Sequence, residues 1–473
     1  MRIAALLVLS ALSTTATAAE KPNILFLFAD DMTYAAIREL GNPEIQTPNL
    51  DRLARQGTCF THASNMGGYH GAVCVASRTM LVTGRSVWRA RELDHQMKQK
   101  EEVGALWPER MHAAGYETYH SGKWHVSTDP AKRFDHLGHY RPGGMPATVP
   151  ESYNRPLAGK PDPWSPSDPK HKGFWEGGKH WSEVVADDAI GFLDDAATRG
   201  KPFFMYIAFN APHDPRQSPQ SFVDRYPASQ IQVPKSFLPE YPWKDQIGCD
   251  PKLRDEALGP FPRTEHAVQV HRQEYYAIIT HLDEQIGRIL DHLEKSGKAA
   301  NTYVFFTADH GLAVGHHGLM GKQNLFDHSV RVPFLARGEK FQAGGRVATP
   351  IYLQDVMPTS LELAGAEIPE SVEFKSLLPL AEGQPSPHHG DAIYGAYTMT
   401  QRSVTKDGFK LVVYPNVPKL LLFDLKADPD EIHDLSGETV HQGRVATMFQ
   451  DLQMLQKRLS DPLVLQASAY GLP

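Results

Sequence analysis

The sequence predicts an α/β fold: a large, doubly wound sheet, mixed or parallel, flanked by helices and followed by a smaller C-terminal subdomain. Three apolar runs rich in β-branched and aromatic residues indicate buried parallel strands, at residues 23–31, 202–210 and 301–311. Helical patterns lie between these runs, an alternation typical of doubly wound sheets. From residue 394 onward, short strand-like runs and a helical tail predict a small antiparallel sheet closed by a helix.

The N-terminal 19 residues have the features of a secretory signal peptide. Arg2 precedes an apolar stretch at residues 3–12, and small residues continue through Ala19. The apolar stretch is too short to span a bilayer. We therefore expect a periplasmic or secreted protein with no membrane anchor, made of a catalytic domain at residues 20–385 and a C-terminal subdomain at residues 386–473.

Two helices are predicted by their own local signals. Residues 47–57, TPNLDRLARQG, contain a helix that ends at a glycine. A longer helix, from about His271 to Lys295, leads into the strand at residues 301–311 and carries one apolar stripe. That stripe consists of Tyr275, Ile279, Leu282, Ile286, Ile289 and Leu293.

Composition limits the functions that are possible. The chain has 473 residues, more than one simple core usually holds, and its net charge of -7 excludes a generally basic nucleic-acid binder. An anionic substrate is still allowed, because the local field of a cleft matters more than the net charge. Among three cysteines, Cys59 and Cys249 could pair in an oxidising compartment, although we expect two unpaired thiols.

Two of the predicted strands end in carboxylates. Asp30 and Asp31 close the first strand, and Asp309 and His310 close the strand at residues 301–311. In open α/β sheets this edge is where ligands bind, and adjacent carboxylates repel each other unless a cation holds them. These four residues predict a metal site that suits a hard ion such as calcium. The alternative is that Asp31 caps a helix while Asp30 is solvated.

Four further residues could bind and turn over an anion. Lys123 and His125 lie in SGKWH, His213 lies in APH just beyond the strand at residues 202–210, and Lys322 lies in HHGLMGKQNLF. Imidazole suits proton transfer near neutral pH. Taken singly, each lysine is more often a solvated surface residue and each histidine a satisfied polar residue, so the argument depends on their occurring together.

The most informative segment is residues 74–85, CVASRTMLVTGR, in which Cys74 opens a Cys-x-Ala-Ser-Arg motif. Alone, Cys74 could be a buried structural thiol. Along the chain, however, Asp-Asp, Cys-x-Ala-Ser-Arg, Gly-Lys-Trp-His, Ala-Pro-His, Asp-His-Gly and Gly-Lys follow in the order seen in type I sulfatases. The sequence resembles this formylglycine-dependent family of the alkaline phosphatase superfamily over most of its length.

The resemblance implies an alkaline phosphatase-like core in which a maturase oxidises Cys74 to Cα-formylglycine. One hydroxyl of the aldehyde hydrate attacks sulfur, and the other then expels sulfate and restores the aldehyde. Arg78, one helical turn later, would sit beside the nucleophile. The resemblance also implies one bound Ca2+. Its ligands would be Asp30, Asp31, Asp309, His310 and an oxygen of modified Cys74. By the same resemblance, Lys123 and Lys322 bind the sulfate, His125 assists turnover of the diol, and His213 contacts the bridging oxygen and protonates the alcohol.

The resemblance has two departures. Many members carry asparagine at the place of His310, which leaves the identity of the metal open, since a nitrogen ligand also tolerates softer metals. Phe326, Asp327 and His328 stand where a Tyr-Glu pair is common, which bears on substrate contacts.

Residues 420–435, LLLFDLKADPDEIHDL, match a C-terminal pattern of the family and predict a strand, a turn and a helix start.

The expected activity is hydrolysis of a sulfate ester, on a saccharide. Residues 141–180 and 212–263 are irregular and aromatic, and their tryptophans either stack on sugar rings or pin the loops to the body. These tryptophans are Trp164, Trp175, Trp181 (just past the first loop) and Trp243. Arylsulfatase activity on a small phenolic ester, phosphonate or phosphodiester hydrolysis, and an unmatured sulfated-glycan binding protein are the alternatives.

Overall fold

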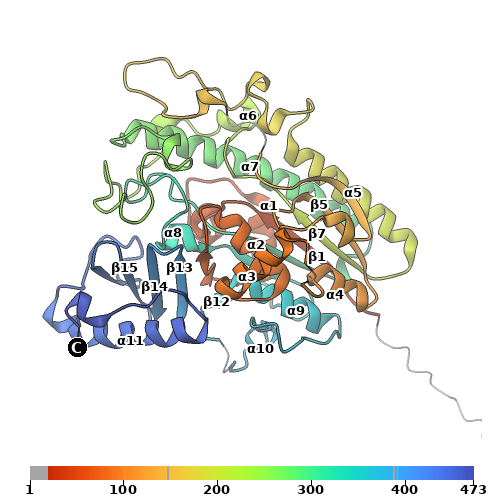
Figure 1. Ribbon diagram of the computed structural model, residues 1–473. Coiled ribbons are helices and arrows are strands. Elements are labelled where there is room, and N and C mark those ends of the chain that lie inside the picture. The colour runs from red at the N-terminus through yellow and green to blue at the C-terminus, as the bar shows by residue number, and fades with distance from the viewer. Residues whose placement is uncertain (1–19, 102, 146–148, 387–388, 391, 473) are drawn as a thin grey trace, which may run out of the picture.

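The structure, a computed structural model, describes residues 20–101, 103–145, 149–386, 389–390 and 392–472 (Figure 1). The predicted signal peptide at residues 1–19 lies outside the described residues. Within the described part of the chain, every helix is too short or too polar to cross a lipid bilayer.

A mixed eight-stranded sheet forms the centre of the molecule, in the order β11-β2-β10-β8-β1-β7-β5-β6. Its strands are β1 (Asn23–Ala29), β2 (Thr58–Phe60), β5 (Glu117–Lys123), β6 (His136–Arg141), β7 (Phe203–Ala208), β8 (Thr302–Ala308), β10 (Phe334–Arg337) and β11 (Gly345–Val347). Strand β10 runs antiparallel to both of its neighbours, whereas the other pairs are parallel. The predicted α/β class with a large mixed sheet is confirmed.

The three strands predicted from apolar runs lie side by side in the middle of this sheet. All seven residues of β1 are buried, and β1 pairs in parallel with β8 on one edge and β7 on the other. Burial on both faces explains why these strands read as continuous apolar runs instead of alternating ones. Strands β1 and β8 end directly before their polar segments, so Asp30 and Asp309 are the first residues beyond them.

Helices cover both faces of the sheet (Figure 1). The helices are α1 (Pro48–Gln56), α2 (Val73–Thr83), α3 (Val87–Lys98), α4 (Trp107–Ala113), α5 (Trp181–Arg199), α6 (Gln220–Val223), α7 (Glu265–Lys295), α8 (Asp327–Val330), α9 (Val356–Leu363), α10 (Leu378–Ala381) and α11 (Gln442–Arg458). On one face, Trp107 of α4 packs edge-on against Phe26 with ring centroids 5.1 Å apart. On the other face, Tyr119 of β5 contacts Phe192 of α5 at 5.2 Å.

Helix α7 begins at Glu265, earlier than the predicted start near His271. The side chain of Thr264 accepts a hydrogen bond from the backbone N–H of Ala267 at 3.1 Å, which caps the helix at this point. The prediction started too late because it relied on the apolar stripe, and the first turns of α7 carry more polar residues.

The C-terminal region forms the predicted antiparallel sheet with its covering helix, α11 (Figure 1). The sheet order is β16-β15-β14-β13-β4, from β13 (Ile393–Tyr397), β14 (Gln401–Lys406), β15 (Phe409–Tyr414), β16 (Lys419–Asp424) and β4 (Gly67–Gly68). Strand β4 comes from the N-terminal part of the chain, a few residues before Cys74, and pairs in parallel with β13. A third, three-stranded sheet has the order β12-β3-β9. Its strands are β3 (Ala63–Ser64), β9 (Arg331–Val332) and β12 (Ile351–Tyr352).

The helix start predicted within residues 420–435 is wrong, because no helix follows β16 until α11 begins at Gln442, after a single 3-10 turn at Thr439–His441. The carboxylate of Asp428 accepts hydrogen bonds from the backbone N–H groups of Ile432 and His433, at 2.8 and 2.7 Å. Glu431 within this turn has a φ of 54°, the left-handed region. A carboxylate that bonds the backbone in this way stabilises a turn in place of a helix.

Two of the tryptophans in and beside the irregular loops are buried. Trp164 and Trp181 are 6% and 7% exposed, and Trp181 donates a hydrogen bond to the side chain of Asn210 at 2.9 Å. These two residues therefore hold the loops to the body, which favours the structural alternative for them.

Candidate active site

Cys74 lies in the first turn of α2, which begins at Val73. The helix is buried along its whole length, and it is capped at its C-terminal end by Gly84, whose φ of 69° favours glycine. Cys74 is 2% exposed, and its sulfur lies 3.4 Å from Nε2 of His310 and 3.5 Å from Nζ of Lys322. The first turn of a buried helix thus presents a thiol to a cluster of charged groups.

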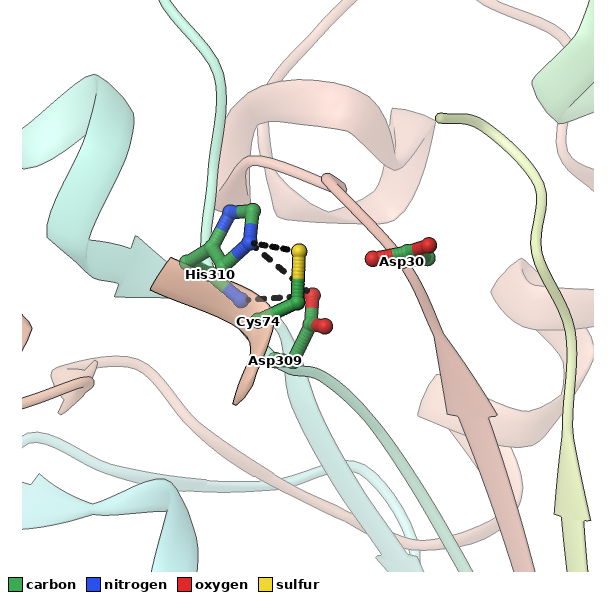
Figure 2. Close-up of side chains that lie close together, drawn as sticks. All are labelled: Asp30, Cys74, Asp309 and His310. Atoms are coloured by element: carbon green, nitrogen blue, oxygen red, sulfur yellow. Dashed lines mark hydrogen bonds and ion pairs between the residues drawn. The ribbon is translucent and has the colours of Figure 1, made fainter. Parts of the chain in front are cut away.

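The ends of β1 and β8 bring carboxylates to the same place. Four residues each offer one possible metal-ligand atom, and these atoms lie within 4.8 Å of one another. The residues are Asp30, Cys74, Asp309 and His310. Figure 2 shows Cys74, Asp309 and His310 grouped together, with Asp30 facing them from the end of β1. One oxygen of Asp30, Oδ1, is buried without a hydrogen-bond partner among the described residues.

These residues fit a divalent cation. A buried carboxylate oxygen without a donor is costly unless a cation or water satisfies it. Burial and the neighbouring Asp309 carboxylate raise the pKa of Asp30. Burial opposes protonation of His310, yet Asp309 and Asp31 raise the pKa of His310 to about 9. A ligating imidazole must be neutral, so a cation would displace a proton from His310.

Arg78 supports the carboxylates from behind. Its Nε donates to Oδ2 of Asp309 at 3.1 Å, its Nη1 donates to the backbone carbonyl of Lys123 at 2.9 Å, and its Nη2 lies 3.8 Å from Oδ1 of Asp30. The guanidinium also stacks over the ring of Phe28 at 4.7 Å. The sequence placed Arg78 beside the nucleophile, whereas these contacts direct it at the two strand ends.

Two buried lysines lie close to the thiol. Lys123, the last residue of β5, forms an ion pair with Asp30, and Nζ of Lys322 donates to both oxygens of Asp31 at 2.9 Å. Burial alone would raise the pKa of Cys74, but Lys123, Lys322 and His310 lower it well below its usual value. The field at Cys74 therefore favours an anion, as a sulfate site requires.

The two predicted histidines face the same space. His125 lies within hydrogen-bonding reach of the Cys74 thiol, and burial and the charge of Lys123 lower its pKa. His213 follows β7, and its Nδ1 donates to the backbone carbonyl of Asp214 at 2.7 Å. Its other nitrogen, Nε2, lies 3.9 Å from Oδ2 of Asp31. Both rings can therefore hold or move a proton at the thiol's side of the site.

Two site residues adopt a left-handed backbone conformation. Asp31 has a φ of 66° and His125 a φ of 53°. Asp31 is held there because its N–H donates to Oδ1 of Asp309 at 3.1 Å, while the hydroxyl of Tyr275 donates to its carbonyl at 2.7 Å. Residues other than glycine adopt this conformation uncommonly, and such residues are enriched at functional sites.

A cavity of about 260 Å³ opens onto this cluster, and part of its lining was not predicted from the sequence. Besides Cys74, His125, His213 and Lys322, the cavity is lined by Gly71, Ala72, Gly144, Leu253, Arg254, Asp255 and Gln323. Arg254 and Asp255 lie in the irregular segment at residues 212–263, where no motif distinguishes them. Gln323 directly follows Lys322, and only this adjacency could have indicated from the sequence that Gln323 lines the cavity.

Comparison with known proteins gives two family models that match this chain. The model described as "Sulfatase" matches residues 22–366, and the model described as "N-sulphoglucosamine sulphohydrolase, C-terminal" matches residues 315–458. Similar relatives include an N-acetylglucosamine-6-O-sulfatase from Bacteroides thetaiotaomicron, 26% identical over 93% of this chain and 87% of the relative. An ulvan-active sulfatase from Formosa agariphila is 27% identical over 88% of this chain and 78% of the relative.

Solved structures share the fold. A structure of a protein in complex with its substrate, D-glucosamine-2-N,6-O-disulfate, superposes with a TM-score of 0.72 at 23% identity, covering 94% of this chain and 99% of that chain. A phosphonate monoester hydrolase from Agrobacterium radiobacter superposes with a TM-score of 0.70 at 19% identity, covering 93% and 96%. At these identities the likeness concerns the fold alone.

Proposed function

The chain belongs to the sulfatase family, and from that premise we propose that it hydrolyses a sulfate ester carried by a saccharide, with Cys74 as the precursor of its nucleophile. The observation that carries this proposal is the position of Cys74. Its sulfur lies within 4.8 Å of carboxylate oxygens suited to a cation and 3.5 Å from Nζ of Lys322, one of two buried lysines suited to a sulfate. A buried structural thiol would have no need of such surroundings.

We propose that Cys74 is oxidised by a maturase to Cα-formylglycine, whose hydrate supplies an oxygen nucleophile and, by losing a proton, a way to release sulfate. We also propose that one Ca2+ is held by Asp30, Asp31, Asp309, His310 and an oxygen of the modified residue 74. These five ligands, mostly oxygens, suit calcium. The cation would supply positive charge at the sulfate and at the nucleophilic oxygen.

The side chains around the thiol then have distinct tasks. Lys123 and Lys322 bind the sulfate oxygens, and both are rigid because their ammonium groups are buried against Asp30 and Asp31. Nε2 of His213 faces the cavity and donates the proton to the departing alcohol. His125, whose lowered pKa keeps it neutral at pH 7, takes a proton from residue 74 during turnover. Arg78 positions Asp30 and Asp309.

The saccharide is supported by relatives whose names specify N-acetylglucosamine 6-O-sulfate and ulvan. Periplasmic or secreted localisation follows from the predicted signal peptide at residues 1–19. We propose the same two parts as the sequence suggests, a catalytic domain at residues 20–385 and a C-terminal subdomain at residues 386–473.

The test is the release of inorganic sulfate, measured by ion chromatography after the purified, matured protein acts on a panel of monosulfated sugars. The proposal predicts sulfate release from at least one sugar, and faster turnover of 4-nitrophenyl sulfate than of a 4-nitrophenyl phosphonate ester. Faster turnover of the phosphonate ester would identify a phosphonate hydrolase. Saturable binding of sulfated sugars without sulfate release, together with an intact thiol at Cys74, would identify a glycan-binding protein.

A further inference from the structure

The outer wall of the active-site cavity carries a charged pair that the sulfatase chemistry does not use. Arg254 and Asp255 line the cavity together with Cys74 and His213. The side chain of Arg254 is 43% exposed, whereas the side chains of Asp255 and Lys322 are 4% and 2% exposed. Arg254 therefore lies at the mouth of the cavity, on the side from which the alcohol part of a substrate would extend.

The guanidinium of Arg254 is held in place by two buried carboxylates. Its Nη2 donates to Oδ1 of Asp255 at 2.6 Å and to Oδ1 of Asp214 at 3.1 Å, and its Nη1 lies 3.0 Å from Oδ2 of Asp214. The guanidinium carries more N–H donors than these contacts use. The pairing fixes its orientation before a ligand arrives, which lowers the entropic cost of binding.

The segment that carries this pair is anchored to the loop of Lys322. Nε2 of Gln323 donates to Oδ2 of Asp255 at 2.7 Å. Next in the chain, the carboxylate of Glu256 accepts hydrogen bonds from the backbone N–H groups of Met320 and Gly321, at 2.9 and 2.8 Å. The distance between the sulfate-binding Lys322 and the pair is thus set by hydrogen bonds and not by a mobile loop.

Arg254 also lies beside the atom that meets the leaving oxygen. Its Nη2 is 3.4 Å from Nε2 of His213. A sugar ring whose sulfate points at Cys74 and whose bridging oxygen meets His213 would place the substituents next to that oxygen against Arg254 and Asp255. The cavity volume of about 260 Å³ suits one sugar ring with its sulfate.

The charges at the mouth are nearly balanced, which decides the kind of substituent. Asp214 and Asp255 are buried, and both contact the guanidinium of Arg254, while Nδ1 of His213 also lies 3.2 Å from Oδ1 of Asp214. Lys322 is 3.8 Å from Asp255 but shares its charge with Asp31 at 2.9 Å. A second anion on the sugar would therefore find no excess of positive charge. Neutral hydroxyls, by contrast, can accept from a guanidinium and donate to a carboxylate at the same time.

We propose that Arg254 and Asp255 bind neighbouring hydroxyl groups of the sugar ring that carries the scissile sulfate, and that they select a ring without a second anionic group beside it. This inference rests on the proposed sulfatase activity. It specifies that the mouth of the cavity binds the ring hydroxyls of the sulfated sugar.

The experiment compares two substrates of the matured enzyme, the monosulfated neutral sugar that the wild type hydrolyses fastest and 4-nitrophenyl sulfate, which has no ring hydroxyls. Loss of hydrogen bonds from a charged group predicts that Arg254→Ala lowers kcat/KM for the sugar about 10- to 150-fold. The loss on 4-nitrophenyl sulfate should be at least about ten times smaller. Arg254→Lys, which keeps the charge but loses the planar fork, should behave like Arg254→Ala. Lys252→Ala, an exposed neighbour in the same turn, is the matched control.

Equal losses on both substrates would overturn the inference, because Arg254 would then act on the sulfate or on His213. A wild type that prefers a sugar with a second anion more than about tenfold, and loses this preference in Arg254→Ala, would also overturn it and identify an anion subsite. These outcomes leave the proposed function intact. If the matured wild type releases no sulfate from any substrate, the proposed function fails instead.

Discussion

The site, which comprises the cavity and the charged cluster that it opens onto, has two halves that are built differently. The sulfate half consists of groups at the ends of β1, β5 and β8, in the first turn of α2 and in the loop of Lys322, and its charged residues are buried. The alcohol half consists of Arg254, Asp255 and Gln323, on irregular segments, and its guanidinium is 43% exposed. The sheet thus fixes the groups proposed for the chemistry, while loops supply the surface proposed to choose the alcohol.

This division predicts how substitutions should behave. A change in the sulfate half should affect every sulfate ester alike, because each ester presents the same group to it. A change in the alcohol half should affect sugar sulfates more than 4-nitrophenyl sulfate. The ratio of the loss of activity on the sugar sulfate to the loss on 4-nitrophenyl sulfate therefore shows to which half a substituted residue belongs.

The largest effect is expected at the nucleophile. Cys74→Ala should lower kcat at least about 10⁴-fold on both substrates, because no other group can take its place. Cys59→Ala is the matched control, since Cys59 is an equally buried thiol on β2, away from the cavity. Activity retained by Cys74→Ala would show that residue 74 is not the nucleophile.

Removal of the cation should come next. Dialysis against a calcium chelator should lower sulfate release about 100-fold or more on both substrates, since a cation supplies several kcal/mol of charge stabilisation. Added Ca2+ should restore the activity, and binding should release protons because His310 is charged in the metal-free site. Full activity in metal-free protein, checked by elemental analysis, would remove the metal from the account.

Lys322→Ala should lower kcat/KM about 100- to 1,000-fold on both substrates, the cost of removing one preorganised donor at a developing charge. Lys340→Ala, an exposed lysine paired with Glu382, should leave the activity unchanged. A loss confined to the sugar substrate would show that Lys322 contacts the alcohol part of the substrate and not the sulfate.

Asp255→Asn should have a smaller and more selective effect. We expect about a tenfold loss on the sugar, since the amide keeps the shape of the carboxylate but not its charge. The loss on 4-nitrophenyl sulfate should be smaller. An equal loss on both substrates would mean that Asp255 acts through Lys322, 3.8 Å away.

The smallest effect on rate is expected at Glu431, beneath the loop of Lys322, where the N–H of Asp327 donates to Oε2 of Glu431 at 2.6 Å. Burial raises the pKa of Glu431 from 4.5 to about 7, although Lys410 opposes this. The folded protein then binds more protons than the unfolded chain in this window, so stability falls as pH rises from about 4.5 to 7. Glu431→Gln should flatten the dependence of Tm on pH in this window, and an unchanged slope would contradict the assignment.

The sequence predicted the sulfate half more fully than the alcohol half, for a physical reason. Buried strands leave apolar runs, and the residue after each run lies at the sheet edge, so Asp30 and Asp309 could be placed without coordinates. Arg254 and Asp255 carry no such signal, because their position depends on contacts with Asp214 and Gln323 far along the chain. The turn at Glu431 was missed for the same reason, since side-chain bonds to the backbone stabilise it.

The most direct test of the central proposal is the mass of the peptide that contains Cys74, from protein made in its native host and active in sulfate release. Conversion of the CH2SH side chain to an aldehyde removes one sulfur and two hydrogens and adds one oxygen. The account predicts this loss in the active fraction, together with an unmodified Cys59 peptide. An active protein in which Cys74 is an intact thiol throughout would contradict it.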